Sequence, residues 1–166
     1  EIEAFGAAPM PSAALVDAGG GLQLYDGALR FRGADGAIVA DGIAAEDYAA
    51  WIGEASLRDS YMKAPYFRPA GFPAGAYRVG PLARLAAADQ LGTPEADDEL
   101  AEFRQRFGFP AHGAFLYHYA RLIEIVHALE RIEMLLGDDA LLGRHVRATA
   151  GVNALRGVGV IEAPRG

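Results

Sequence analysis

Short apolar runs separated by turn residues occupy the first 43 positions of the chain. Each run is three to five residues long, the length of a short strand, and they fall at 14–16, 22–25, 28–32 and 37–40. Asp26-Gly27 separates the second run from the third, and Ala34-Asp35-Gly36 separates the third from the fourth. Asp-Gly between two apolar runs favours a hairpin, because glycine adopts positive φ at low steric cost. The pattern predicts an N-terminal β-meander.

The third run alternates in polarity. Leu29 and Phe31 take turns with Arg30 and Arg32. Because successive side chains of a strand point to opposite faces, this alternation predicts one buried face and one solvent-facing side.

From residue 44 onward the apolar spacing becomes helical. Helices are predicted at 45–54, 82–88, 94–107 and 114–136. Between the first two, residues 56–81 carry too many prolines and glycines for a continuous helix or a central strand. Their aromatic residues must nevertheless lie against an apolar surface, either of this chain or of a surface outside this sequence.

The longest predicted helix, 114–136, has an apolar stripe with spacings of three and four. The stripe comprises Phe115, Tyr119, Leu122, Val126, Leu129, Ile132 and Leu136. The expected fold class is therefore α+β and mainly helical, with a β-meander part at 1–43 and a mostly helical part at 44–166. We expect residues 1–166 to be a single internal segment of a larger catalytic domain.

Composition narrows the function classes. The 166 residues carry 15 basic and 22 acidic side chains, a formal net charge of −7, which argues against a nucleic-acid partner. The chain has no cysteine, which excludes a disulfide scaffold, a cysteine nucleophile and a cysteine-ligated metal site within these residues. It has no run of 18 apolar residues, so no membrane span is predicted and we expect a cytoplasmic protein.

Histidines invite a metal hypothesis. Glu124-x-x-His127 has the i, i+3 spacing that places two ligands on one helix face. Such sites need a second copy of the motif, and none occurs. We therefore interpret both residues as part of the polar face of the long helix.

Several arginines lie in an apolar or Gly/Pro-rich context, where an unpaired cation is costly: Arg78, Arg84, Arg121, Arg131, Arg147 and Arg165. We expect ion pairs such as Arg121 with Glu124, and Arg131 with Glu130 or Glu133. An arginine in a dry site can also act on a ligand through its charge and its donors.

Five sequence blocks together resemble nickel-iron hydrogenase large subunits. They are DSYMKAPY at 59–66, YRVGPLARL at 77–85, HYARLIE at 118–124, HVRATAG at 145–151 and GVGVIEAPRG at 157–166. The blocks are most similar to the cytoplasmic, cofactor-reducing branch of that family. The resemblance implies that the parent protein oxidises H₂ and reduces protons reversibly at a Ni-Fe(CO)(CN)₂ centre.

In that family the centre hangs from two Cys-x-x-Cys pairs, and this sequence contains neither. The resemblance therefore implies an internal fragment that is inactive on its own and holds no metal or cofactor.

Within the last block, Pro164 and Arg165 match residues that lie over the bimetallic centre. The resemblance implies a catalytic role for them, with the arginine acting as a base or as a hydrogen-bond donor. Pro164 would fix the backbone before it.

The expected partners are a small subunit with iron–sulfur clusters and an NAD-linked diaphorase module. The alternative is a non-catalytic interaction module related to the complex I subunit of the same ancestry.

Overall fold

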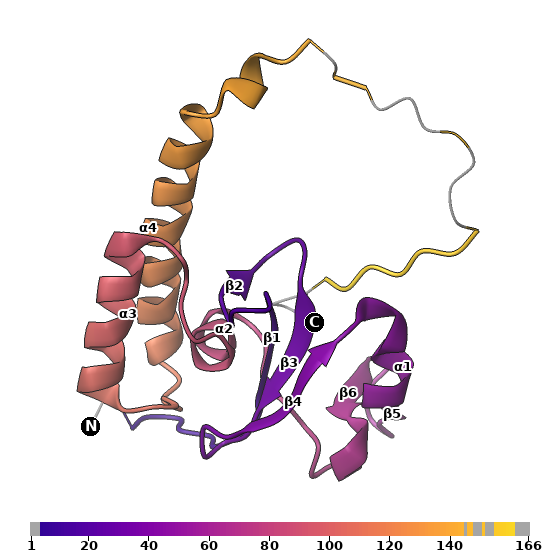
Figure 1. Cartoon of the computed structure of the whole chain (residues 1–166). Coiled ribbons are helices and arrows are strands. Elements are labelled where there is room, and N and C mark those ends of the chain that lie inside the picture. Colours follow the sequence, from indigo (N-terminus) through magenta and orange to yellow (C-terminus); the bar gives the residue numbers. More distant parts are fainter. Residues whose placement is uncertain (1–3, 145, 148–150, 152–154, 162–166) are drawn as a thin grey trace.

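A computed structural model describes residues 4–144, 146–147, 151 and 155–161 (Figure 1). Its first part is an antiparallel sheet of β1 (Ser12–Val16), β2 (Leu22–Gln23), β3 (Ala28–Arg32) and β4 (Ile38–Ile43). The strand order is β2-β1-β3-β4. The predicted α+β class, with strands first and a long helix later, is confirmed.

The strand order corrects the predicted hairpin at Asp26-Gly27. Strands β2 and β3 are not neighbours, because β1 lies between them: Leu15 pairs with Gln23 on one side and with Leu29 on the other. The tight turn falls at 17–21 instead, where one carboxylate oxygen of Asp17 accepts the N–H groups of Gly19 and Gly21. The turn at 34–36 does join two paired strands, as predicted, with Gly36 at a φ of +86°.

The helix predicted at 45–54 has different bounds in the structure. The expected helix 45–54 is shorter, since α1 covers only Tyr48–Trp51 and the chain continues as β5 (Ile52–Ser56). β5 pairs with β6 (Lys63–Phe67), which lies inside the segment expected to be irregular. Pro65 is tolerated there because a two-stranded sheet leaves one edge of each strand unpaired. Short 3₁₀ turns lie at Ala45–Asp47, Arg68–Ala70 and Asp139–Leu142.

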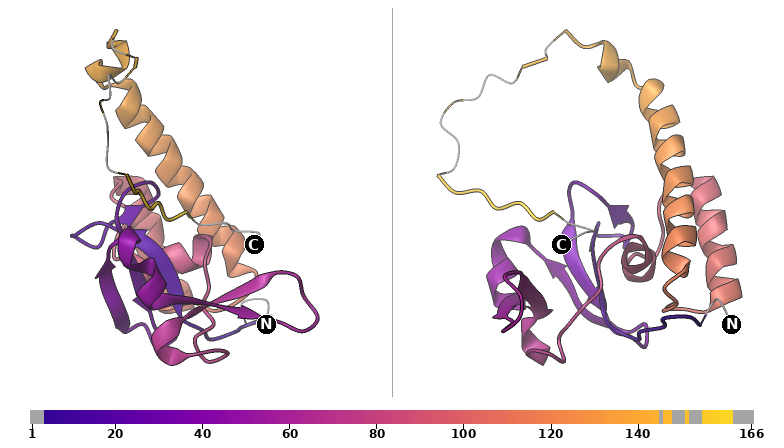
Figure 2. Two further views of the ribbon diagram at one scale, coloured as in Figure 1. Left: turned by 90° about the vertical axis from the view of Figure 1, so that its right-hand side faces the viewer. Right: turned by 180° about the vertical axis from the view of Figure 1, so that it is seen from behind.

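Three longer helices confirm the predicted positions to within two residues. They are α2 (Pro81–Ala87), α3 (Pro94–Phe107) and α4 (Leu116–Leu136). Figures 1 and 2 show α3 and α4 side by side, with α2 between this pair and the sheet. α2 is buried along nearly its whole length, because it contacts both the sheet and α4.

Two aromatic residues of 56–81, Phe67 and Tyr77, pack against the chain's own sheet. The ring of Phe31 on β3 lies 4.6 Å from that of Phe67 and 5.2 Å from that of Tyr77. Trp51 stacks on Phe67 from the outer side, with ring centroids 6.0 Å apart. The chain itself therefore covers Phe67 and Tyr77, whereas Tyr61 and Phe72 are 98% and 45% exposed.

The predicted wet side of β3 is wrong. Arg30 and Arg32 are only 5% and 7% exposed, as buried as Leu29 on the opposite face. Helix α2 and the segment after it cover the arginine face, so both faces of β3 are buried. Alternation of charge and apolarity along a strand shows which side chains share a face, but not what covers that face.

The apolar stripe in the sequence of the long helix does not coincide with the buried face of that helix. The buried residues of α4 are Leu116, Ala120, Ile123 and His127. Leu122, Leu129 and Leu136 of the predicted stripe are 59%, 61% and 74% exposed. A small residue, Ala120, lies at the centre of the buried face, where it allows close approach of α2 and α3. Tyr119 and Val126 of the apolar stripe pack against the edge of the core, and the rest of the stripe faces away from it.

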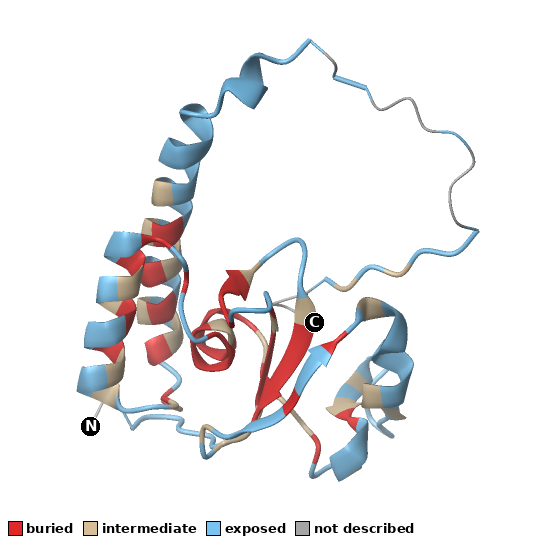
Figure 3. Ribbon diagram, in the orientation of Figure 1, coloured by how far each residue is buried: buried red, intermediate tan, exposed pale blue. Residues whose placement is uncertain are grey.

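Among the helices of the described residues, none is both long and apolar enough to cross a bilayer. Figure 3 shows burial concentrated in the sheet, in α2 and in the lower half of α4. The upper half of α4 projects beyond α3 and is exposed.

Replacing Asp89 by asparagine should lower the free energy of unfolding by about 2–3 kcal/mol, because two buried guanidinium groups lose their shared anion. Urea unfolding followed by circular dichroism measures the loss. Asp98→Asn, a matched change at an exposed position of α3, should shift the same quantity by no more than about 0.5 kcal/mol. Equal losses in both variants would contradict a structural role for Asp89.

Candidate functional site

The most concentrated charge in the described chain is an ion-pair network behind the sheet, which we call the arginine network (Arg30, Arg32, Asp41, Asp89). Arg30 makes a two-pronged contact with Asp41, at 3.0 Å from Nε and 2.8 Å from Nη2. Its third nitrogen, Nη1, lies 2.9 Å from Asp89. The other oxygen of Asp89 accepts a hydrogen bond from Arg32 at 2.6 Å.

These contacts shift the ionisation of the partners. Hydrogen bonding to Asp41 raises the pKa of Arg30 above its ordinary value, against the opposing effect of burial. The same hydrogen bonds from Arg30 lower the pKa of Asp41. Both groups therefore stay charged through the neutral range, and the network is a permanent ionic link rather than a proton donor.

Close backbone approach positions Asp89. The backbone N–H of Asp89 donates to the carbonyl of Gly20 at 2.8 Å. Gly20 has a φ of +82°, and a Cβ at this position would collide with the Asp89 carboxylate. A glycine is thus required here for both reasons.

Arg104 adds a third guanidinium beside the network, from α3. It donates to the carbonyl oxygens of Leu85, Ala88 and Asp89 at 2.9, 2.7 and 2.9 Å, which caps the C-terminal end of α2. Burial lowers the pKa of Arg104, and the nearby charge of Arg32 lowers it further. Both guanidinium groups lie near the ring of Phe109, at 5.3 Å for Arg32 and 4.8 Å for Arg104.

A second ion pair joins α2 to α4. Arg84 contacts Glu124 through two nitrogens, at 2.5 Å from Nε and 2.8 Å from Nη2. The side chains of both residues are about 15% exposed, so the pair is largely removed from water. Arg84 also lines the cavity described next.

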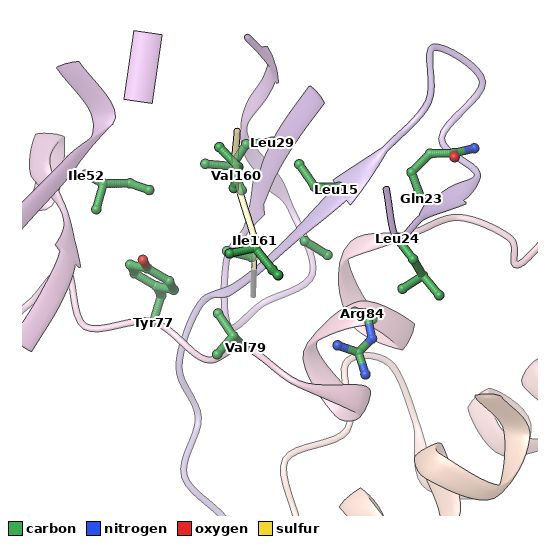
Figure 4. A pocket seen from close by; sticks show the side chains of 12 residues that line it. Leu15, Gln23, Leu24, Leu29, Ile52, Tyr77, Val79, Arg84, Val160 and Ile161 are labelled. Atoms are coloured by element: carbon green, nitrogen blue, oxygen red, sulfur yellow. The ribbon is translucent and has the colours of Figure 1, made fainter. Parts of the chain in front are cut away.

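An apolar cavity of about 240 Å³ lies between the sheet and the segment 160–161 (Figure 4). Leu15 and Leu29 form its floor, Tyr77 and Val79 one wall, and Val160 and Ile161 lie across it. Arg84 is the only charged side chain in the lining that the structure describes. Such a lining suits an apolar ligand or side chain and offers no set of metal ligands.

A buried histidine lies where α4 meets the start of α3. His127 Nδ1 is 2.9 Å from the hydroxyl of Thr93, and the ring is 7% exposed. One turn further along α4, the carboxylate of Glu130 accepts the N–H groups of Glu95 and Ala96 at 3.0 Å each. Glu130 therefore caps the first turn of α3, a task usually performed by the residue before the helix.

These contacts show that both residues of the Glu-x-x-His motif have partners within the chain. Glu124 binds Arg84, and His127 binds Thr93 and is buried rather than on a polar helix face. Within the described residues, no three side chains of the His, Asp and Glu types gather closely enough to hold a metal ion. The expected pairs of Arg121 with Glu124 and Arg131 with Glu130 are corrected, because those glutamates have the other partners just named.

The predicted catalytic residues Pro164 and Arg165 lie outside the described residues, as does His145. Arg121, Arg131 and Arg147 are exposed, whereas Arg78 is buried and donates to the carbonyl of Ala8 at 2.8 Å. Sequence patterns did not single out Arg30, Arg32 and Asp89 as a buried charged cluster. One signal for them existed: 14 of the 15 basic residues are arginine, the cation best suited to buried pairs.

Comparison with known proteins identifies the kind of protein that has this arrangement. No protein-family model matches the chain. A solved structure described as an NAD⁺-reducing [NiFe]-hydrogenase in the H₂-reduced state superposes with a TM-score of 0.90 and 46% sequence identity. The superposition covers 99% of this chain and 37% of that one.

The chain is similar to hydrogenase subunits. It is 42% identical over 86% of its length to a subunit of the F420-non-reducing hydrogenase Vhu of Methanocaldococcus jannaschii. It is 36% identical over its whole length to the beta subunit of the NAD-reducing hydrogenase HoxS of Cupriavidus necator. In each case it spans about a third of the relative, 34%.

The names of the hydrogenase relatives correct the predicted subunit. Besides these two relatives, the chain is 36% identical to a protein of Archaeoglobus profundus that is named as an iron-sulfur subunit of an F420-non-reducing hydrogenase. None of these three names describes a large subunit, and the one that specifies a cofactor gives iron–sulfur. The prediction of a nickel-iron large subunit, with a Ni-Fe(CO)(CN)₂ centre as its cofactor, is therefore wrong, and the comparisons show similarity to hydrogenase subunits. The complex I-related alternative has no counterpart among these names.

The buried histidine yields a test of the site. Burial lowers the pKa of His127 below the ordinary value of 6.5, with a further contribution from the charge of Arg131. At a pH between the lowered pKa and 6.5, the imidazole of His127 is protonated in the unfolded chain but not in the folded chain. The free energy of unfolding should therefore fall as the pH falls below about 6.5.

His127→Gln, which keeps a polar group near Thr93, should flatten this decline. Urea unfolding at a series of pH values from about 7 to 5 measures the slope. His118→Gln, at an exposed position of the same helix, should retain the wild-type slope. An unchanged slope in His127→Gln would show that other groups cause the acid sensitivity.

Proposed function

We propose that the chain is a structural part of a hydrogenase-associated oxidoreductase subunit that takes part in electron transfer. The observation that carries the proposal is the 46% identity and TM-score of 0.90 over 99% of the chain, against a solved NAD⁺-reducing hydrogenase. Similarity of sequence and of backbone over the same residues favours a shared place in a similar complex.

The chemistry of these residues limits their role in that complex. Iron–sulfur clusters are held by cysteine thiolates, and the sequence has no cysteine. Glu124 and His127, the pair with metal-ligand spacing, are engaged by Arg84 and Thr93. The residues of this chain therefore do not fit a metal cluster, and thiolate ligands would come from other polypeptide.

The buried charges fit a scaffold instead. The arginine network joins β3 to β4 and to the end of α2, Arg104 joins α2 to α3, and Arg84 joins α2 to α4. Removing one partner from such a pair leaves a buried charge, so each pair enforces one relative position of its two elements. A fixed arrangement is what electron transfer between separately held clusters requires from the surrounding protein.

The partners that we propose are a subunit carrying iron–sulfur clusters and an NAD-linked module. Similarity to two NAD-reducing hydrogenases supports the second. For these partners, the acidic chain with a net charge of −7 offers a surface that basic patches would recognise.

The test uses the polypeptide that carries this sequence, produced together with its neighbouring subunits. The purified complex should reduce benzyl viologen in the presence of H₂ under anaerobic conditions. Glu124→Gln should destabilise the complex by about 2 kcal/mol and lower its yield, because Arg84 loses a charged partner. Iron per assembled complex, measured by mass spectrometry, should stay at the wild-type value.

Glu133→Gln, at an exposed position of the same helix, is the matched control and should change neither quantity. Absence of H₂-dependent reduction in the wild-type complex would refute the hydrogenase association. A fall in iron per complex for Glu124→Gln alone would show that this carboxylate serves a metal site and not the scaffold.

A further inference from the structure

Helix α4 has a second apolar face, opposite the one that packs on the core. We call it the outer stripe; it begins at the polar His118 and continues through the apolar residues Leu122, Ile125, Leu129, Ile132 and Leu136. All six residues are exposed, with Leu122 at 59%, Ile125 at 49% and Leu129 at 61%. Exposure of consecutive large apolar side chains on one face is costly in water and marks a contact surface.

The spacing of the outer stripe specifies the shape of what covers it. Its members follow one another at intervals of 4, 3, 4, 3 and 4 residues. An alternation of four and three is the pattern by which one α-helix packs along another at a small crossing angle. From His118 to Leu136 the stripe runs for about 27 Å, five turns of helix. The complementary object is therefore another helix and not a flat sheet or a small ligand.

The last two turns of α4 need cover on more than one side. From Arg131 to Leu136 every residue is exposed, and the apolar ones include Met134 at 56% and Leu135 at 50%, which point away from the outer stripe. Apolar side chains therefore lie on more than one side of this part of the helix, interrupted by Arg131 and Glu133. Such a distribution is typical of a helix that is covered on several sides. Figure 3 shows this part of α4 projecting beyond α3 with no described element beside it.

The exposed apolar residues outside the outer stripe, Met134 and Leu135, discriminate between occupants. Pairing of two copies of the chain along the outer stripe would cover one face of each α4 and leave Met134 and Leu135 in water. A body of several helices would cover the remaining sides as well. Hydrogenase relatives have the length for such a body, because the matched region is 34% of the curated relatives and 37% of the solved chain.

We propose that the outer stripe docks an amphipathic helix from the part of a hydrogenase-type polypeptide that lies outside these 166 residues. The helix has its own apolar 4-3 stripe, and α4 becomes a central helix between it and the α2–α3 layer. This inference rests on the proposed function for the source of the helix. It goes beyond that function by naming the surface and the chemistry of its partner.

Leu129→Glu in two settings tests the proposal. In the 166-residue chain, Leu129 is exposed, so the charge should leave the urea midpoint and the monomeric mass by light scattering unchanged. In the polypeptide that carries this sequence, the same charge would be buried against the docked helix. The yield of folded, monodisperse protein should therefore fall about fivefold or more.

Tyr61→Glu is the matched control, since Tyr61 is a large exposed side chain far from α4 in the sequence, 98% exposed. Tyr61→Glu should leave the urea midpoint and the mass of the 166-residue chain unchanged, as well as the yield of the longer polypeptide. Three results would overturn the proposal: loss of stability in the 166-residue chain, full yield of Leu129→Glu in the longer polypeptide, or a dimer of the 166-residue chain that Leu129→Glu dissociates. The last result would identify a second copy as the occupant. This test does not measure hydrogenase activity. A complex without hydrogenase activity would therefore refute the proposed function, whereas the docking proposal is judged only by the stability, mass and yield measured here.

Discussion

The contact on which the structure depends is the sharing of Asp89 between Arg30 and Arg32. Two guanidinium groups on one strand face would repel each other and resist burial, and the carboxylate between them makes that face compatible with a dry interior. Asp89 lies directly beyond the end of α2, so the same contact fixes where that helix ends against the sheet. The close approach at Gly20 adds a backbone hydrogen bond to the ionic one.

Helix α2 transmits this fixed position to the rest of the chain. Its C-terminal carbonyls accept hydrogen bonds from Arg104 of α3, and its Arg84 holds Glu124 of α4. Each neighbour of α2 is thus held by at least one charged contact in addition to apolar packing. Apolar packing alone tolerates sliding between elements, whereas a two-pronged ion pair has a narrow range of geometry.

Local patterns predicted the elements well and their environment poorly. Helix starts at Pro81 and Pro94, the stop at Gly108 and the turn at Gly36 depend on backbone preferences that a short sequence window contains. The burial of Arg30 and the exposure of Leu129 depend on which element covers a face, and that element is distant in the sequence. The predicted strand order failed for the same reason, because β1 separates two strands that a turn signal joined. Pro164 and Arg165 stay a prediction.

The buried charged face of β3 and the exposed apolar face of α4 have a common physical meaning. On β3, charges are buried because this chain supplies their counterions, and on α4, leucines are exposed because this chain supplies no cover among its described residues. The first face is complete within the chain, and the second is the half of an interface. In a scaffold, ionic contacts fix the helices and strands relative to one another, and an apolar helix face packs against the neighbouring part of the protein. In the proposed function, that arrangement is the contribution of a chain without cysteine, and the thiolate ligands of metal clusters come from other polypeptide.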